Sequence, residues 1–416
     1  MISRPASHLV EPGSIAYKYS SPGFGVENLP YASFAPNGAG PRLGVRIGEK
    51  VLDVAALVQI DRGGSPELLR VVGGPNLDAL LEADREVWDE LRLLITRQVT
   101  SAGVAAGLEI YSLDDVKLFM PFTVADYVDF YASEHHATNV GRIFRPDQAP
   151  LTPNWKHLPI GYHGRAGTIV PSGTEILRPK GLRPEPGGQP SFGPSRKLDI
   201  EAEIGFVIGG GAPAGEVKIE DAGRHIFGAV IVNDWSARDI QAYEYVPLGP
   251  FLGKSFATSI SAWVMPMAAL ASAFVKPPKR EQGLAKYLND DSSPPFGLDI
   301  SLEVFVDGDL VSTPPFASMY WTPAQMLAHM TVNGASLRSG DFFASGTVSG
   351  PEKHQRGSFL ELSWNGTEPL LLPGGRDFRF LEDGNEIVIR ATAPGPSGTP
   401  IEFGEVSGRI RPATAT

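Results

Sequence analysis

Short runs in which apolar and polar residues alternate predict β-strands near the start of the chain. Every second residue of 42–47 is apolar, and apolar residues return at Val51 and Val54 after Gly48 and Glu49. Side chains at period two face one side of a strand, and a two-residue turn between such runs favours a hairpin. We therefore predict a small β unit in this region.

Apolar residues at helical spacing follow between residues 76 and 96. Pro75 and Asn76 precede them as start signals. The apolar positions recur mostly three or four residues apart, at Leu77, Leu80, Leu81, Trp88, Leu91, Leu94 and Ile95. This pattern predicts one amphipathic helix.

From residue 118 onward the chain is denser in aromatic residues, His and Asp, and short apolar runs recur between turn residues. These runs are residues 204–208, 226–232, 302–306 and 386–391. Their length and spacing predict the strands of a rolled or barrel-like β domain. We therefore expect a mainly β fold with minor α content, with an N-terminal domain over residues 1–117 and a C-terminal domain over 118–416.

The composition supports a folded protein rich in turns and narrows its partners. The chain has 47 Gly and 37 Pro, and its 42% apolar and 20% charged residues are typical of globular proteins. The formal net charge of −11, without a Lys or Arg cluster, argues against nucleic acid as a partner. No apolar stretch approaches the roughly 20 residues that span a bilayer. Residues 1–19 lack a signal pattern, so we expect no membrane partner and a cytoplasmic location.

The first segment with candidate chemistry is residues 126–141. Asp129 and Tyr131 are two positions apart, so in a strand a carboxylate and a phenol would face the same side, with His136 a few residues downstream. Surface acids and a structural histidine would give the same residues. This segment alone leaves both interpretations open.

A second segment, residues 198–206, places Glu201 and Glu203 on one face of an extended strand, and Asp199 would share that face. Acids on the water-facing side of a half-buried strand would produce the same alternation. The apolar continuation at 205–209 favours a buried strand instead. Neighbouring carboxylates near a core repel one another unless a cation holds them.

Two further polar residues come from well-placed segments. Asp234 follows the apolar strand expected at 228–232, and the end of a buried strand is a rigid support for active-site groups. Lys254 comes from a Gly- and Pro-rich loop and stands between Leu252 and Phe256, so we expect it to be partly enclosed.

The sequence thus offers four candidate metal-ligating carboxylates, which belong to Asp129, Glu201, Glu203 and Asp234. The chain contains no cysteine, which excludes disulfides, thiolate nucleophiles and cysteine-ligated zinc. An all-oxygen ligand set suits Mg²⁺ or Ca²⁺. Such an ion chelates two oxygens of a substrate and stabilises developing enolate charge as a Lewis acid.

These candidates lie within longer strings that resemble the fumarylacetoacetase family. The resemblance runs from about Phe24 to Arg411 and includes residues 28–31, 127–141, 153–165, 198–203, 233–241, 245–256 and 345–350. The broader superfamily shares only the acidic residues and a few glycines. The matching segments around Tyr162, Gln241 and Tyr245 therefore favour this branch.

The resemblance implies a small SH3-like N-terminal β domain, a C-terminal mixed β-roll domain that carries the site, and a homodimer. It also implies hydrolysis of the carbon–carbon bond of 4-fumarylacetoacetate to fumarate and acetoacetate, the last step of tyrosine and phenylalanine catabolism. One alternative is a related diketo-acid hydrolase or decarboxylase of the acylpyruvate type. Another is a non-catalytic calcium-binding or scaffold protein, in which His136 and Glu361 would lie apart or be exposed to solvent.

By the same resemblance each candidate residue has an expected role. The four carboxylates would bind Mg²⁺ and/or Ca²⁺, and Asp234 with Lys254 and Thr258 would hold a second ion. His136 would be the general base, oriented by Glu361. The expected substrate contacts are Tyr131, Arg145, Tyr162, Gln241, Tyr245 and Thr347.

Elementary chemistry agrees with these roles. A His–Glu pair suits water activation because the carboxylate fixes the tautomer and stabilises the imidazolium. Arg145 suits a substrate carboxylate because its guanidinium donates two parallel hydrogen bonds. Arg238, Gln241 and Lys254 can donate hydrogen bonds to a tetrahedral oxyanion, where the loss of one donor commonly costs about 3 kcal/mol.

Overall fold

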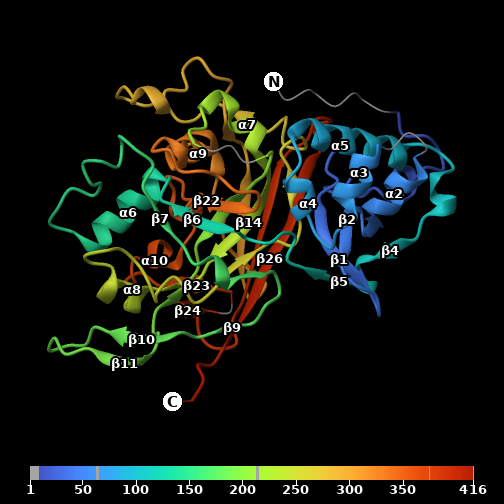
Figure 1. Cartoon of the computed structure of the whole chain (residues 1–416). Helices are drawn as coiled ribbons and strands as arrows, with labels where there is room; N and C mark the ends of the chain where they lie inside the picture. Colours follow the sequence, from blue (N-terminus) through green and yellow to red (C-terminus); the bar gives the residue numbers. More distant parts are fainter. Residues whose placement is uncertain (1–8, 62–64, 212–214, 374, 416) are drawn as a thin grey trace.

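The computed structural model describes residues 9–61, 65–211, 215–373 and 375–415 (Figure 1). Residues 1–8 of the segment searched for a signal pattern lie outside the described residues. Strands outweigh helices, and a small N-terminal sheet domain precedes a C-terminal mixed-sheet domain, so the prediction of a mainly β fold is confirmed. None of the described helices is both long and apolar enough to cross a membrane.

The N-terminal sheet contains the predicted hairpin. Its strands lie in the order β4-β3-β2-β1-β5. They are β1 Tyr31–Pro36, β2 Arg42–Ile47, β3 Lys50–Asp53, β4 Ile110–Ser112 and β5 Val116–Phe119. β2 and β3 pair antiparallel across the turn at 48–49. Gly48 has φ 54° and lies so close to the Tyr19 carbonyl that a Cβ atom would clash with it, so both the turn and the contact require glycine.

Helices pack on this sheet (Figure 1) and include α2 Val54–Ile60, α3 Pro66–Val72, α4 Asp78–Leu81 and α5 Arg85–Thr100. The prediction of one helix between residues 76 and 96 is wrong, because the chain turns between α4 and α5. Asp84 has an extended backbone (φ −69°, ψ 161°) at the N-cap of α5, so a continuous helix cannot include it. Trp88 Nε1 donates a hydrogen bond to the Leu80 carbonyl at 2.7 Å and joins the two helices.

Two larger sheets form the C-terminal domain. The first has eight strands in the order β7-β6-β22-β13-β14-β16-β8, with β17 paired to β14, and the second has five in the order β21-β20-β25-β26-β9. The predicted apolar runs correspond to β13 Ala202–Ile208, β14 Ile226–Asp234, β20 Ser301–Val306 and β25 Glu386–Pro394. The other strands are β6 Asp126–Phe130, β7 Gly161–His163, β8 Ile169–Pro171, β9 Ile176–Leu177, β16 Thr258–Ile260, β17 Met265–Pro266, β21 Asp309–Ser312, β22 Asp341–Ala344 and β26 Pro400–Arg411.

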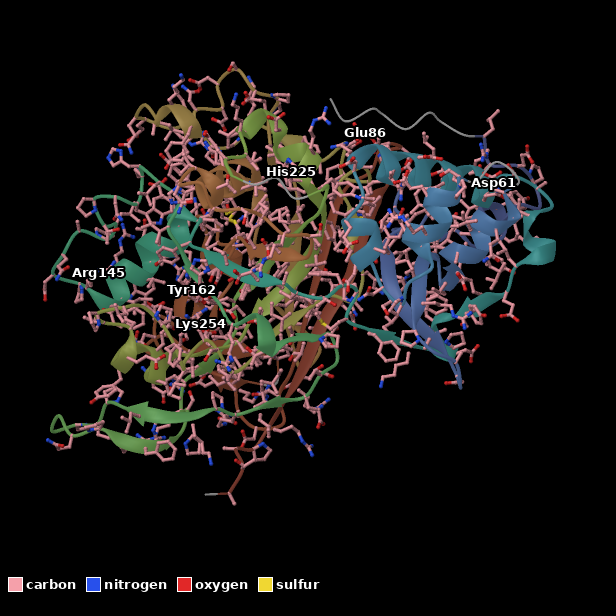
Figure 2. The ribbon with its side chains drawn as sticks, viewed as in Figure 1. Asp61, Glu86, Arg145, Tyr162, His225 and Lys254 are labelled. Carbon is pink, nitrogen blue, oxygen red and sulfur yellow. The ribbon has the colours of Figure 1, made fainter. Side chains whose placement is uncertain are left out.

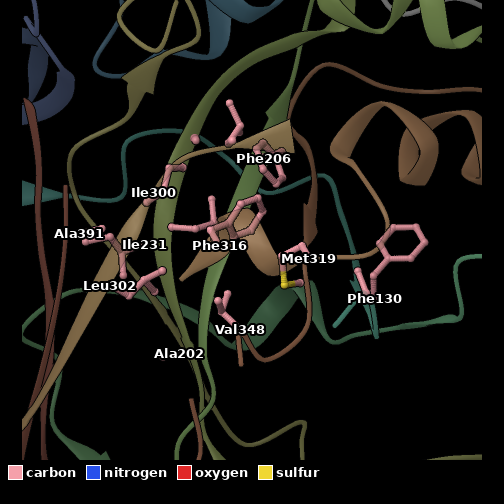
Figure 3. Packing of buried hydrophobic residues seen from close by; sticks show 14 of the residues in the cluster. Phe130, Ala202, Phe206, Ile231, Ile300, Leu302, Phe316, Met319, Val348 and Ala391 are labelled. Atoms are coloured by element: carbon pink, nitrogen blue, oxygen red, sulfur yellow. The ribbon is translucent and has the colours of Figure 1, made fainter. Parts of the chain in front are cut away.

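The central strands β13 and β14 are buried on both faces, which explains their unbroken apolar runs. Phe206 and Ile231 pack into a core shared with the second sheet, which Figure 3 shows from close by. Val207 and Val230 lie in another core that also contains side chains of the N-terminal domain. Full burial of one such side chain stabilises the fold by about 1.5–3 kcal/mol. The two strands are therefore a rigid support for the polar residues at their ends.

Candidate active site

Four buried carboxylates converge where three strands begin or end. They belong to Asp129 in β6, to Glu201 directly before β13 and Glu203 near its start, and to Asp234 at the end of β14. Each offers one oxygen atom, and these four oxygens lie within 4.8 Å of one another. The four acids singled out in the sequence thus form one group in space.

Strand register brings these carboxylates together. β13 and β14 are antiparallel, and Ala202 lies opposite Asn233, so the start of one strand meets the end of the other. β22 connects β6 to β13, because Ala344 lies opposite both Asp129 and Gly205. Spacing along the sequence contains no information on such long-range pairings.

The electrostatics of this group are those of a cation site. Burial, followed by repulsion from neighbouring acids, raises the pKa of Asp129 and of Glu203 well above the ordinary carboxyl value. Burial also raises the pKa of Asp234. Asp129 Oδ1 and Glu203 Oε1 are buried and accept no hydrogen bond from any described residue. Two uncompensated carboxylate oxygens beside two further carboxylates fit a divalent metal ion.

Lys254 lies against the group and is only 7% exposed. Its Nζ donates a hydrogen bond to Glu201 Oε2 and another, of 2.6 Å, to Asp234 Oδ2. Thr258 Oγ1 donates to Asp234 Oδ1 at 2.7 Å, and Tyr162 Oη, from β7, donates to Asp234 Oδ2 at 3.4 Å. Burial alone would lower the pKa of Lys254, but the charges of Asp234 and Glu201 outweigh it and raise that pKa. Lys254 and Tyr162 line one cavity and lie close together in Figure 2.

A His–Glu pair lies beside the carboxylates. His136 is in α6 (Glu134–Phe144) and Glu361 is in α10 (Phe359–Leu362), and both side chains are buried. His136 Nδ1 lies 2.7 Å from Glu361 Oε2, and His136 Nε2 lies 3.9 Å from Glu201 Oε1. The neighbouring imidazole of His135 has no such partner among the described residues.

Further hydrogen bonds hold Glu361 in its ionised form. Asn139 Nδ2 donates to Oε1 at 2.9 Å, and the hydroxyls of Ser349 and Ser358 donate to Oε2 at 3.0 and 2.8 Å. Burial alone would raise the pKa of Glu361, but His136 and the donated hydrogen bonds outweigh it and lower that pKa. Sequence reasoning missed these donors. Spacing could have indicated two of them, because Ser358 precedes Glu361 by three positions and Asn139 follows His136 by three on one helix.

Arg238, the first residue of α8 (Arg238–Glu244), contacts several polar groups. Its Nε donates to Asp199 Oδ2 at 2.7 Å, and its Nη1 lies 2.8 Å from Glu201 Oε1 and 3.2 Å from Gln241 Oε1. Its Nη2 is buried and has no hydrogen-bond partner in the described part of the chain. The described residues therefore leave this N–H group without an acceptor.

Asp199 is not one of the four clustered acids, although alternation along the sequence predicted a shared face. β12 (Leu198–Asp199) and β13 are separate strands, so the alternation does not continue from one to the other. The Asp199 carboxylate accepts hydrogen bonds from Arg238 and from the backbone amides of Phe359, at 2.7 Å, and Leu360, at 3.0 Å. It therefore ties Arg238 to α10.

Tyr131 and Thr347, two of the residues expected to contact substrate, lie near His136 and the four carboxylates. The ring of Tyr131 stands edge-on to the ring of His136, with centroids 5.3 Å apart. Thr347 Oγ1 is buried without a hydrogen-bond partner among the described residues and follows Gly346, whose N–H donates to Glu203 Oε2 at 3.1 Å.

The other two, Arg145 and Tyr245, lie near the end of α6. Arg145 Nη2 donates to the Pro150 carbonyl at 3.2 Å, and the ring of Tyr245 lies 6.4 Å from that of Phe144. Figure 2 shows Arg145 apart from Lys254. No hydrogen bond or ion pair in the described structure joins either residue to the acidic group.

Comparison with known proteins identifies the family. A profile described as Fumarylacetoacetate (FAA) hydrolase C-terminal matches residues 126–411, and one described as Fumarylacetoacetase N-terminal matches residues 27–121. The chain belongs to the fumarylacetoacetase family. The resemblance stated from the sequence is thereby confirmed, and the chain is a hydrolase of this family.

Two full-length fumarylacetoacetases illustrate the similarity. The Homo sapiens protein is 43% identical over 409 residues, which cover 94% of this chain and 96% of the relative. The Caenorhabditis elegans protein is 44% identical over 414 residues, which cover 94% and 97%. Among solved structures, maleylpyruvate hydrolase from Sphingobium sp. SYK-6 in complex with manganese(II) and pyruvate has a TM-score of 0.52 at 17% identity, over 93% of this chain and 100% of that one. This structural likeness shows the shared fold.

Proposed function

We propose that this chain hydrolyses 4-fumarylacetoacetate to fumarate and acetoacetate, the last step of tyrosine and phenylalanine catabolism. The observation that carries the proposal is the buried group of four carboxylates beside the His136–Glu361 pair. Cleavage of a 1,3-diketone by water needs a base and a way to stabilise the departing carbanion as an enolate, and this site offers residues for both. Relatives named Fumarylacetoacetase, at 43% and 44% identity, support the substrate.

His136 is the proposed general base. The ionised Glu361 accepts the N–H of Nδ1, which leaves Nε2 as the nitrogen that takes a proton from water. Nε2 faces Glu201 Oε1 at 3.9 Å, so a water molecule beside the carboxylates lies within its reach. As the proton moves to Nε2, the negative charge of Glu361 stabilises the imidazolium.

We infer that the resident ion is Mg²⁺ and/or Ca²⁺, held by the four clustered carboxylates. Hard oxygen ligands without sulfur favour these cations. When bound, the ion supplies a Lewis acid for two substrate oxygens and for the enolate charge. A second ion is proposed to be held by Asp234 together with Lys254 and Thr258, which both donate to Asp234 and would contribute partly through backbone oxygens.

Arg238, Gln241 and Lys254 are the proposed donors to the oxyanion. Arg238 Nη2 is buried without a partner, and Lys254 uses two of its three N–H groups on carboxylates. Gln241 accepts a hydrogen bond through Oε1, which leaves its amide N–H groups able to donate. The residues proposed to contact substrate are Tyr131, Arg145, Tyr162, Gln241, Tyr245 and Thr347.

We also propose an SH3-like domain over residues 1–117, a catalytic β-roll domain over 118–416, and a cytoplasmic homodimer. Exposed apolar side chains in the loop after α8 support the dimer, because Val246, Leu248 and Phe251 are 66%, 97% and 64% exposed. Sedimentation of the wild type and of Leu248→Glu tests this part. A dimer that the substitution shifts toward monomer supports it, and a monomeric wild type contradicts it.

The test of the main proposal compares 4-fumarylacetoacetate with acylpyruvates under identical conditions. We expect fumarate and acetoacetate in equal amounts, and the highest kcat/KM on 4-fumarylacetoacetate. A higher kcat/KM on acylpyruvates, or release of carbon dioxide in place of two acids, would favour the acylpyruvate-type alternative.

A further inference from the structure

A cavity of about 160 Å³ lies beside the acidic group. Tyr162 and Lys254 line it, and both contact Asp234, so these two side chains stand between the cavity and the candidate metal site. Phe251 and Arg165 also line it. At about 30 Å³ for each water molecule, this space corresponds to roughly five waters, or to one small acyl group.

The backbone of Arg165 is fixed from two sides. The N–H of Gly164 donates to the Tyr127 carbonyl at 2.9 Å, and a Cβ atom at this position would lie 2.2 Å from the Tyr127 ring, so the approach requires glycine. On the other side, Thr168 Oγ1 lies 3.1 Å from the Arg165 carbonyl oxygen and 2.9 Å from that of Ser255. These contacts fix where the Arg165 side chain starts, beside the loop that carries Ser255.

The charge of Arg165 has no partner among the residues that the structure describes. Its guanidinium makes no hydrogen bond, ion pair or ring contact with any described residue, whereas other arginines such as Arg178 and Arg196 pair with carboxylates. In the same cavity the hydroxyl of Tyr127 is buried and also lacks a hydrogen-bond partner among the described residues. An unpaired guanidinium and an unpaired hydroxyl beside one cavity suit an anionic ligand group.

The site has an arginine on each side. The charge of Arg145 acts on Tyr131, whose ring stands against His136, while Arg165 lies on the side of Lys254. In the proposed reaction, water activated by His136 attacks the fumaryl carbonyl, and we place the acetoacetyl half of the substrate on the side of Lys254, whose cavity Arg165 also lines. We propose that Arg165 binds the carboxylate of this acetoacetyl half and thereby selects dicarboxylic substrates; this proposal rests on the proposed function.

Substrates that lack one carboxylate test this role. Fumarylacetone ends in a methyl group where 4-fumarylacetoacetate carries its acetoacetyl carboxylate, and crotonylacetoacetate lacks only the fumaryl carboxylate. Kinetic constants would be measured on all three compounds for the wild type, Arg165→Met and Arg165→Lys. Arg142→Met is the matched control, because Arg142 is exposed, has no ion pair in the described structure and lies outside the cavity.

We expect Arg165→Met to raise KM for 4-fumarylacetoacetate and crotonylacetoacetate by about 10- to 100-fold, the range for a lost charge-assisted pair. The kcat should stay within about threefold. Arg165→Lys should raise KM less than Arg165→Met does, because lysine keeps the positive charge but lacks the two parallel N–H donors of the guanidinium. On fumarylacetone, Arg165→Met should match the wild type.

Two results would overturn the proposal. One is an Arg165→Met enzyme that behaves like Arg142→Met on all three compounds. The other is a KM penalty that persists on fumarylacetone, because the lost partner would then not be the acetoacetyl carboxylate. A wild type that cleaves none of the compounds refutes the proposed function itself, which is a distinct outcome, and the role of Arg165 falls with it.

Discussion

Replacement of Glu361 by glutamine tests the His–Glu pair most sharply. The carboxylate accepts hydrogen bonds from His136, Asn139, Ser349 and Ser358, all at 3.0 Å or less, and it is fully buried. The amide of glutamine keeps the shape of the Glu361 carboxylate but removes its negative charge. Its NH₂ group can only donate hydrogen bonds, so it would face groups that also donate. The variant should therefore bind substrate but fail to stabilise the imidazolium.

The size of the expected loss in kcat follows from the contact between His136 and Glu361. Two unit charges about 4 Å apart interact by about 4 kcal/mol at an effective dielectric constant of about 20, and each 1.36 kcal/mol corresponds to tenfold in rate. We expect kcat of Glu361→Gln to fall by about 100- to 1,000-fold, with KM changed by less than about threefold.

The assay follows the loss of the ultraviolet absorbance of 4-fumarylacetoacetate at saturating substrate. Glu368→Gln is the matched control, because Glu368 is exposed and its ion pair in the described structure is with Lys353 on the surface. The control should retain kcat within about twofold. If Glu361→Gln retained kcat to the same extent, Glu361 would not support a base and the reasoning would be refuted.

Three further predictions follow from the same geometry. Mg²⁺ at 100 times its Kd should raise the free energy of unfolding of the wild type by about 2.7 kcal/mol, measured by thermal unfolding. Asp129→Asn should lose most of this increase, and an equal increase in both proteins would exclude Asp129 as a ligand. Asp199→Asn removes one of the two buried carboxylates that pair with Arg238 and should lower the free energy of unfolding in urea by about 3–5 kcal/mol. The exposed control Asp377→Asn should lower it by less than about 0.5 kcal/mol, and equal losses would contradict the role of Asp199. The lowered pKa of Glu361 means that its ionised form contributes stability above the unfolded pKa of about 4.3, and this contribution is lost as the pH falls through the lower folded value. Glu361→Gln should accordingly flatten the acid side of the stability curve, and an unchanged acid side would contradict this.

The sequence predicted local structure well where one periodicity dominates. The hairpin of β2 and β3 follows from alternation over a few residues and from the turn at Gly48. The helix between residues 76 and 96 was predicted as one because its apolar spacing continues across a break. The break between α4 and α5 depends on the extended backbone of Asp84 and on the hydrogen bond from Trp88 to Leu80. The periodicity of apolar residues carries no information on either feature.

The sequence predicted which residues form the candidate site better than it predicted how they are arranged in space. Residue types indicated the four acids and the family resemblance added the base, but the convergence of these residues depends on the pairing of β6, β22, β13 and β14. The same limit explains Asp199, which alternation grouped with the acids and which instead accepts from Arg238. Nothing in the sequence singled out Arg165, because a side chain with no partner inside the chain becomes informative only when the adjoining cavity is known.

Hydrolysis by this site should depend both on a bound metal ion and on His136 as the base. The most direct measurement is the rate of 4-fumarylacetoacetate loss for the wild type with Mg²⁺, for the wild type with a chelator, and for His136→Ala with Mg²⁺. We expect rapid loss in the first sample alone, with fumarate and acetoacetate formed in equal amounts. Rapid loss in the presence of the chelator, or by His136→Ala, would contradict this expectation.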